Sequence, residues 1–367
     1  MAQVKSARPL ELFSRAEWSA LTRVSRWRGT WLVVHCWAVI ALVIGVALWG
    51  WDALGPLAGV PAVLLAIVIV GGRQLGLAIL MHDAAHGLLS PDRRWNNRLG
   101  EWLTGAPVGS DLKAYRTYHL THHRYTQQEE DPDLILSKPF PTSGASLRRK
   151  VWRDLTGRTF LRTRGAQLAA AWAALKQQRP KTVSPEPVEG RFADAGEVSA
   201  GEASFDRLRT TDEGQGSANG TEKEGGDGEV KSFAGVAMLR FLAVNALLLI
   251  VPWALGAGPW PFLIWIAALA TTFQLFLRVR NIAEHACTAT GSDDPFTHAR
   301  TTHANWAERA TVAPYWVNYH SEHHLFMAVP CYRLPAAHRL LAAKGLTSRM
   351  TIAPGYVAVL RMAGGAA

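Results

Sequence analysis

Three clusters of histidines have the spacing that binds metal ions. They read His82-Asp83-Ala84-Ala85-His86, His119-Leu120-Thr121-His122-His123 and His320-Ser321-Glu322-His323-His324, and they hold eight of the thirteen histidines. Residues three or four apart share one face of an α-helix, so each cluster can direct two or three imidazoles at one point. Neutral imidazole is the commonest metal ligand, and a tetrahedral ion takes about four ligands. Eight convergent rings are too many for one ion, and we infer a site for two metal ions.

The other histidines differ in their value as candidate ligands. His285 follows Asn281 by one helical step and joins the candidates. Four others have no clean partner at helical spacing, and we interpret them as structural, surface or supporting residues: His35, His298, His303 and His338. The acidic residues 129–133 follow the second cluster. They are either a solvated turn or carboxylates that orient the second nitrogen of metal-bound imidazoles, and the sequence leaves both interpretations open.

Apolar segments must position these clusters. Hydrophobic residues make up 49% of the 367-residue chain, which includes 15 Trp, and they are concentrated in four blocks. The blocks are residues 31–51, 57–80, 234–255 and 262–277, and they are candidates to cross the roughly 30 Å hydrocarbon core of a bilayer as helices. We therefore expect an all-α integral membrane protein. Four transmembrane helices would be capped by a cytosolic helical domain that holds the histidine-rich dimetal site.

Basic residues mark the ends of the second and fourth blocks. Arg73 is expected near the far interface, where its aliphatic stem lets the charge reach water. A helix that continues past Arg73 lifts the first histidine cluster above the membrane. The fourth block repeats this layout, with Asn281 and His285 beyond Arg278 and Arg280. Both long helices should therefore present their polar ends on one side.

We divide the chain into five parts by composition. They are a basic cytosolic N-terminus at 1–29, two transmembrane helices and a cytosolic region with two histidine clusters at 30–181, a disordered insertion at 182–232, two further transmembrane helices at 233–280, and a cytosolic C-terminal region at 281–367. The insertion is rich in Gly, Ser and Glu, so it cannot form a core. Lys and Arg favour cytoplasmic loops, which predicts cytoplasmic termini and a multi-pass protein of the inner membrane. Residues 95–103 are expected to form an interfacial amphipathic helix or a packed connecting helix.

These motifs resemble those of the integral-membrane fatty acid desaturase and hydroxylase family. HDAAH, HLTHH and HSEHH, in this order among four apolar blocks, carry the resemblance over about residues 30–160 and 234–340. RNIAEHA resembles the additional ligand segment of acyl desaturases, in which an Asn holds a metal through water. The tail from EHHLF through VPCYRLP resembles bacterial desaturases of the dihydrorhizobitoxine desaturase-like subgroup. Carotenoid ketolases share the three boxes and a following DPD, so residues 131–133 do not separate the two activities.

The resemblance implies an enzyme with two iron ions and O2 as a cosubstrate. Its metal ligands would be His82, His86, His119, His122, His123, His285, His320, His323 and His324, with Asn281 binding through water. Imidazole suits several metals, so the choice of iron over zinc rests on the resemblance. No catalytic residue is expected beyond these ligands.

The expected activity is the introduction of a double bond into a fatty acyl or lipid chain. A lipid hydroxylase or carotenoid ketolase is the alternative, because it uses the same ligands, and a non-oxidative membrane zinc protein is a minor one. The sequence contains no haem-binding HPGG segment and no glycine fingerprint for flavin or NAD. Electrons are therefore expected from a separate donor, such as ferredoxin or a cytochrome b5-like protein. The basic residues 138–181 suit either such a carrier or anionic lipid headgroups, and no nucleic acid partner is expected.

Overall fold

The computed structural model describes residues 4, 7–177 and 226–365. We predicted a disordered insertion at 182–232, and its residues 182–225 lie outside the described residues. Helix α11 (Gly226–Pro252) begins at Gly226, so this helix starts within the range that composition assigned to the insertion.

Four helical segments among the described residues are long and apolar enough to cross a membrane, as the sequence predicts: Arg28–Leu54, Pro56–Ala85, Gly235–Ala257 and Trp260–His285. The first two are α3 (Arg28–Leu54) and α4 (Pro56–Ala85), which form a hairpin around Gly55. Gly55 has a φ of 73°, which a residue with a side chain rarely adopts. The third is the apolar part of α11, which ends in a π-helical turn (Trp253–Ala257). The expected all-α membrane fold with four spanning helices is confirmed.

The fourth segment consists of two helices. α12 (Trp260–Ala270) and α13 (Thr272–His285) meet at Thr271, whose φ and ψ of −120° and −83° are not helical. The hydroxyl of Thr272 donates to the carbonyl oxygen of Ile67 at 2.8 Å. A Cβ on Gly71 would lie 2.1 Å from the Thr272 hydroxyl oxygen, so only glycine allows α4 and α13 to approach this closely. This contact fixes the two helices that carry histidines out of the spanning region.

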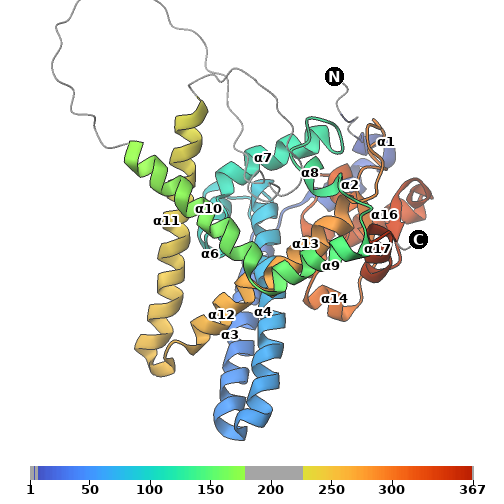
Figure 1. The fold of residues 1–367 in the computed structure, drawn as a ribbon. Coiled ribbons are helices and arrows are strands. Elements are labelled where there is room, and N and C mark those ends of the chain that lie inside the picture. The colour runs from blue at the N-terminus through green and yellow to red at the C-terminus, as the bar shows by residue number, and fades with distance from the viewer. Residues whose placement is uncertain (1–3, 5–6, 178–225, 366–367) are drawn as a thin grey trace, which may run out of the picture.

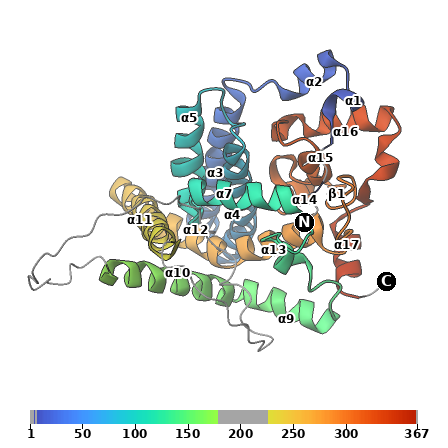
Figure 2. The same ribbon diagram turned by 90° about the horizontal axis from the view of Figure 1, so that it is seen from above.

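The remaining elements gather at one end of the spanning helices (Figure 1). The helices are α1 (Pro9–Leu12), α2 (Arg15–Thr22), α5 (Arg93–Arg98), α6 (Ala106–Val108), α7 (Leu112–Tyr125), α8 (Leu134–Ser137), α9 (Gly144–Leu155), α10 (Arg158–Gln177), α14 (Trp306–Ala310), α15 (His320–Leu325), α16 (Leu334–Ala343) and α17 (Tyr356–Ala363). Two short parallel strands, β1 (Arg300–Thr302) and β2 (Thr351–Ala353), pair Arg300 with Thr351. Seen from above, α7 crosses the end of α4, and α15 lies to one side of it, next to α16 (Figure 2).

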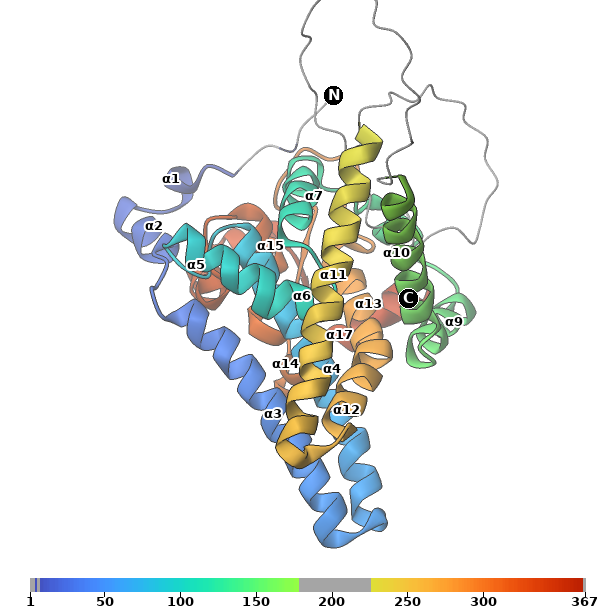
Figure 3. The same cartoon turned by 90° about the vertical axis from the view of Figure 1, so that its left-hand side faces the viewer.

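The region predicted at 95–103 is a packed connection with an apolar outer side. It continues from α5 into a π-helix (Leu99–Gly105) that lies against α4 (Figure 3). A Cβ on Gly100 would lie 2.5 Å from the Cβ of Ala84, which shows how closely the segment packs on α4. Trp95 and Trp102 remain exposed. The side packed on α4 agrees with the predicted connecting helix. The exposed tryptophans on the other side agree with the predicted amphipathic helix.

Arg73 differs from the prediction. Its side chain does not reach towards water: it is only 7% exposed, and its Nη2 donates to the carbonyl oxygens of Arg309 and Ala310 at 3.0 and 2.9 Å. These carbonyls lie at the end of α14, where helical carbonyls lack partners within the helix. The prediction was wrong because the C-terminal region folds back against α4 and covers the position that the apolar pattern assigned to the interface.

Candidate metal centre

All nine candidate histidines come together, and they do so as two groups. The first group is His82, His86, His119, His123 and His323, and the second is His122, His285, His320 and His324. Within each group, the nitrogen atoms that could bind an ion all lie within 4.8 Å of one another. The groups combine residues from α4, the segment just after it, α7, α13 and α15.

Helix geometry explains how one cluster serves both groups. In α7, His119 and His123 are one helical turn apart and point into the first group, whereas His122 belongs to the second. Consecutive residues are rotated by about 100° around a helix, so His122 and His123 cannot point to the same place. α15 is arranged in the opposite way, with its i, i+4 pair in the second group and its middle histidine in the first.

The ring nitrogens approach one another closely in both groups. His123 Nε2 lies 2.9 Å from His119 Nε2 and 3.0 Å from His323 Nε2. In the second group, His320 Nε2 lies 2.9 Å from His285 Nε2. A neutral imidazole carries only one N–H, so several such nitrogens that converge here must present lone pairs to a common point.

Buried nitrogens without partners support a cation at this point. His82 is 4% exposed, and neither its Nδ1 nor its Nε2 has a hydrogen-bond partner among the described residues. The same holds for Nε2 of His86. A buried polar atom without a partner costs free energy, and coordination of a metal ion removes that cost. The residues present therefore fit a metal ion.

The outer nitrogens of the second group are held by hydrogen bonds. Asp131 Oδ1 lies 2.7 Å from His122 Nδ1, and the carbonyl oxygen of His298 lies 3.0 Å from His285 Nδ1. Thr126 Oγ1 lies 3.3 Å from the Nδ1 of His324. An Nδ1–H that donates outwards leaves Nε2 free to bind a metal, and it fixes the ring orientation.

These contacts settle the open question about residues 129–133. Asp131 is buried and orients His122, whereas Glu129 and Glu130 are exposed. Both interpretations therefore hold, because Asp131 is a supporting carboxylate and the two glutamates belong to a solvated acidic turn. Of the histidines outside the two groups, His298 supports the centre, as described, and His35 bonds Tyr315. His338 pairs with Glu322 of α15 at 2.5 Å, and His303 is exposed.

Most of these histidines are unprotonated at pH 7, which is the state that binds a metal ion. Burial, followed by the charges of neighbouring imidazoles, lowers the pKa well below 6.5 for His119, His123, His320, His323 and His324. These rings are therefore neutral at pH 7, as a ligand must be. Burial also opposes a charge on His122, but Asp131 and Asp133 outweigh it and raise the pKa of this ring to about 9. A metal ion that binds His122 must displace a proton.

Glu284 and Arg280 are members of the centre that the sequence interpretation missed. Glu284 Oε1 accepts a hydrogen bond from Arg280 Nε at 2.5 Å and lies 3.3 Å from the Nδ1 of His320. Both side chains are nearly buried, so the guanidinium neutralises the carboxylate that supports His320. Their i, i+4 spacing within RNIAEHA was the available signal. Only the position of α15 shows what the pair contacts.

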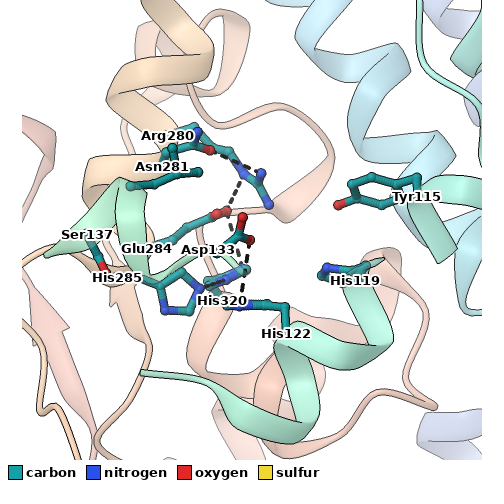
Figure 4. A pocket seen from close by; sticks show the side chains of 11 residues that line it. Tyr115, His119, His122, Asp133, Ser137, Arg280, Asn281, Glu284, His285 and His320 are labelled. Carbon is teal, nitrogen blue, oxygen red and sulfur yellow. Dashed lines mark hydrogen bonds and ion pairs between the residues drawn. The ribbon is translucent and has the colours of Figure 1, made fainter. Parts of the chain in front are cut away.

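Asn281 lies beside the second group but belongs to neither group of histidines. It lines a small cavity together with His122, His285 and His320 (Figure 4). Its Oδ1 accepts a hydrogen bond from Arg280 at 3.4 Å. Asn281 therefore faces the space next to the second group.

A larger cavity of about 160 Å³ adjoins this small one. Its apolar lining comes from α4 and α13. It includes Leu75 and Ile79 of α4 and Phe273 and Leu277 of α13. The residues that line both cavities are Tyr115, Asp133, Leu136, Arg280 and Asn281. His82 lines the larger cavity as well. An apolar slot between the spanning helices thus leads to the histidines.

Comparisons with known proteins agree with the histidine motifs. The model of a family described as fatty acid desaturase matches residues 54–195 and 219–355. A dihydrorhizobitoxine desaturase from Bradyrhizobium elkanii is 26% identical over 311 residues, which cover 82% of this chain and 71% of that protein. A beta-carotene ketolase from Paracoccus sp. (strain PC1) is 33% identical over 108 residues, or 28% of this chain and 38% of the ketolase. A second ketolase, from Paracoccus sp. (strain N81106 / MBIC 01143), is 34% identical over 62 residues, which cover 17% of this chain and 26% of the relative.

Proposed function

This chain belongs to the fatty acid desaturase family, and from that premise we propose that it is a membrane oxidoreductase that uses O2 to introduce a double bond into a fatty acyl or lipid chain. The observation that carries the proposal is the position of the apolar cavity, which reaches His82 of the first group and adjoins the small cavity that His122, His285 and His320 of the second group line. A relative that matches 82% of this chain is named a desaturase, which supports the same reaction type.

We propose that the nine histidines are metal ligands, and that Asn281 binds through a water molecule. Imidazole alone does not select a metal, and the family favours two iron ions. When bound, such a metal pair supplies the O2 chemistry that removes hydrogen from an unactivated methylene.

The protein itself contributes placement. Residues of α4 and α13 shape the cavity so that two neighbouring carbons of a chain can lie beside His82 and Asn281. The buried histidines and the apolar lining keep bulk water away. Because the sequence has no binding motif for haem, flavin or NAD, the electrons come from a separate protein, a ferredoxin or a cytochrome b5-like carrier.

The proposed location is the inner membrane, with both termini in the cytoplasm. α1, α2, α16 and α17 all lie at the histidine-bearing end of the molecule (Figure 1). The basic residues before α3 and the α3–α4 turn, which has no Lys or Arg, support this orientation.

Mass spectrometry of the product tests the reaction type. We would express the protein in a host, together with a ferredoxin and its reductase, and compare cellular lipids with and without the protein. New double bonds support the proposal. The two ketolases make hydroxylation or ketolation the second candidate, and products that gain oxygen would establish it. Zinc as the resident metal, with no O2 uptake in the presence of reductant, would favour a non-oxidative protein.

Blocking the cavity should abolish turnover without removing the metal. Ala78 lines the cavity, and phenylalanine at this position would fill it. We expect Ala78→Phe to reduce product formation more than about tenfold while the metal content stays that of the wild type. Ala38→Phe, on an exposed face of α3, is the control. Full activity in Ala78→Phe would show that the substrate binds elsewhere.

Residues 196–218 should be dispensable. The family model matches the chain on both sides of this segment and leaves the segment itself unmatched. Deletion of 196–218 is expected to leave activity within about twofold of the wild type, because a segment so rich in Gly, Ser and Glu has too few apolar residues to contribute to a core. Activity and metal content of the purified deletion variant check this. Loss of activity in a folded, metal-loaded variant would give the segment a role in the reaction.

A further inference from the structure

Helix α9 has one face towards the protein and one face away from it. Asp154 on the inner face is fully buried and forms a bidentate ion pair with Arg278 of α13. The outer face carries Arg148, Arg149 and Trp152, with Trp152 63% exposed. The ion pair fixes the direction of α9, so the outer residues form a defined surface.

This surface is an open groove of about 610 Å³. The residues that line it are Ala145, Arg148, Arg149, Trp152, Arg153 and Arg158. Within the described part of the chain, no acidic side chain forms an ion pair with Arg148, Arg149 or Arg158. The Nε of Arg153 is shielded from solvent and has no acceptor among the described residues. The groove therefore concentrates positive charge and offers a buried donor that lacks an acceptor.

The groove lies beside the spanning helices. Gly157 joins α9 to α10, and a Cβ added there would lie 3.8 Å from the carbonyl oxygen of Ala270, the last residue of α12. Figures 1 and 3 show α9 next to α13, where α13 continues from α12 towards the histidine-bearing end, and Figure 2 shows α9 and α10 along one outer edge. Leu155 follows the lining residue Trp152 by three positions in α9, and Leu161 follows Arg158 by three positions in α10, so each shares a helix face with a lining residue; their side chains are 41% and 68% exposed. Arginines, a tryptophan and exposed leucines together are typical of a membrane interface.

We propose that this groove binds the phosphate of an anionic phospholipid on the histidine-bearing side of the membrane. The arginines would hold the phosphate, and the acyl chains would lie against Trp152, Leu155 and Leu161. A soluble acidic electron carrier would meet the same charges, but the exposed leucines beside the spanning helices favour a lipid. This inference does not depend on the reaction that the enzyme catalyses.

Native mass spectrometry of the purified, metal-loaded protein tests the proposal. The protein in detergent is titrated with phosphatidylglycerol or with zwitterionic phosphatidylcholine. We expect tighter binding of phosphatidylglycerol, and about 30-fold weaker binding in Arg149→Gln/Arg158→Gln, from the usual contribution of two arginines near an anionic surface. Arg23→Gln/Arg339→Gln removes the same charge from exposed positions directly after α2 and on α16, and its affinity should match the wild type.

Further arms separate the possible occupants. Trp152→Ala should weaken binding of phosphatidylglycerol, and inorganic phosphate should not displace the lipid, because the acyl chains contribute to binding. Equal binding of both lipids, or the same loss in the two double variants, would overturn the proposal. It would also be overturned if the groove variant kept its lipid affinity but lost turnover with an acidic electron carrier, because the face would then be a protein docking surface.

Discussion

Replacing His122 with alanine is expected to abolish both metal loading of the second group and product formation. The second group has four histidines, and the variant would keep three. Loss of a supporting hydrogen bond to a metal ligand usually costs about 10- to 100-fold, so loss of the ligand itself should cost more than about 100-fold. Metal analysis of the purified variant and lipid analysis of cells that express it measure the two effects.

The neighbouring substitution His123→Ala tests the division into groups. His122 and His123 are adjacent in α7 but belong to different groups. Each variant should therefore lose one ion, and iron Mössbauer spectra of the two preparations should show different remaining sites. His303→Ala changes an exposed histidine outside both groups and should leave metal content and activity unchanged. Normal product formation by a metal-replete His122→Ala protein would count decisively against the proposed site.

Asparagine in place of Asp131 is expected to lower activity by about 10- to 100-fold. The carboxylate lies 2.7 Å from His122 Nδ1 and is buried, so no solvent replaces it. An asparagine can still accept the hydrogen bond that the Gln127 N–H donates to Asp131 Oδ2 at 2.8 Å, which limits damage to the turn. Activity and metal content of the purified variant are the measurements.

The same substitution should change how metal binding depends on pH. Burial disfavours the charged form of His122, but Asp131 and Asp133 outweigh burial and raise its pKa to about 9. A metal ion competes with this proton, so apparent affinity should increase as pH rises towards about 9 and then level off. Without the Asp131 charge the pKa is lower, and Asp131→Asn should show a weaker dependence between pH 7 and about 9. Titrations of the metal-free protein measure it.

Matched controls are available in the same turn. Glu129→Gln and Glu130→Gln make the same chemical change at exposed positions, and both variants should behave like the wild type. An equal loss of activity in all three variants would show that the negative charge of the turn matters in general. That result would remove the specific role of Asp131 in orienting His122.

The sequence by itself determined the features that depend on neighbouring residues. Spacing within a helical turn identified nine histidines that converge, because side chains three and four residues apart always share a helix face. Continuous apolar runs identified the four spanning segments, since a helix in a bilayer must be apolar over its crossing length. The motifs in this order indicated the family, and the family model matches most of the chain.

Only the tertiary structure decided how these parts are combined. The division of each H-x-x-H-H cluster between the two groups depends on how α7 and α15 pack relative to α4 and α13, which no local pattern contains. The same arrangement brings Glu284 to His320 and Asp131 to His122, and it buries Arg73 beneath α14. These contacts join residues from different elements, so their geometry follows from packing of the whole chain and not from the spacing of residues along it.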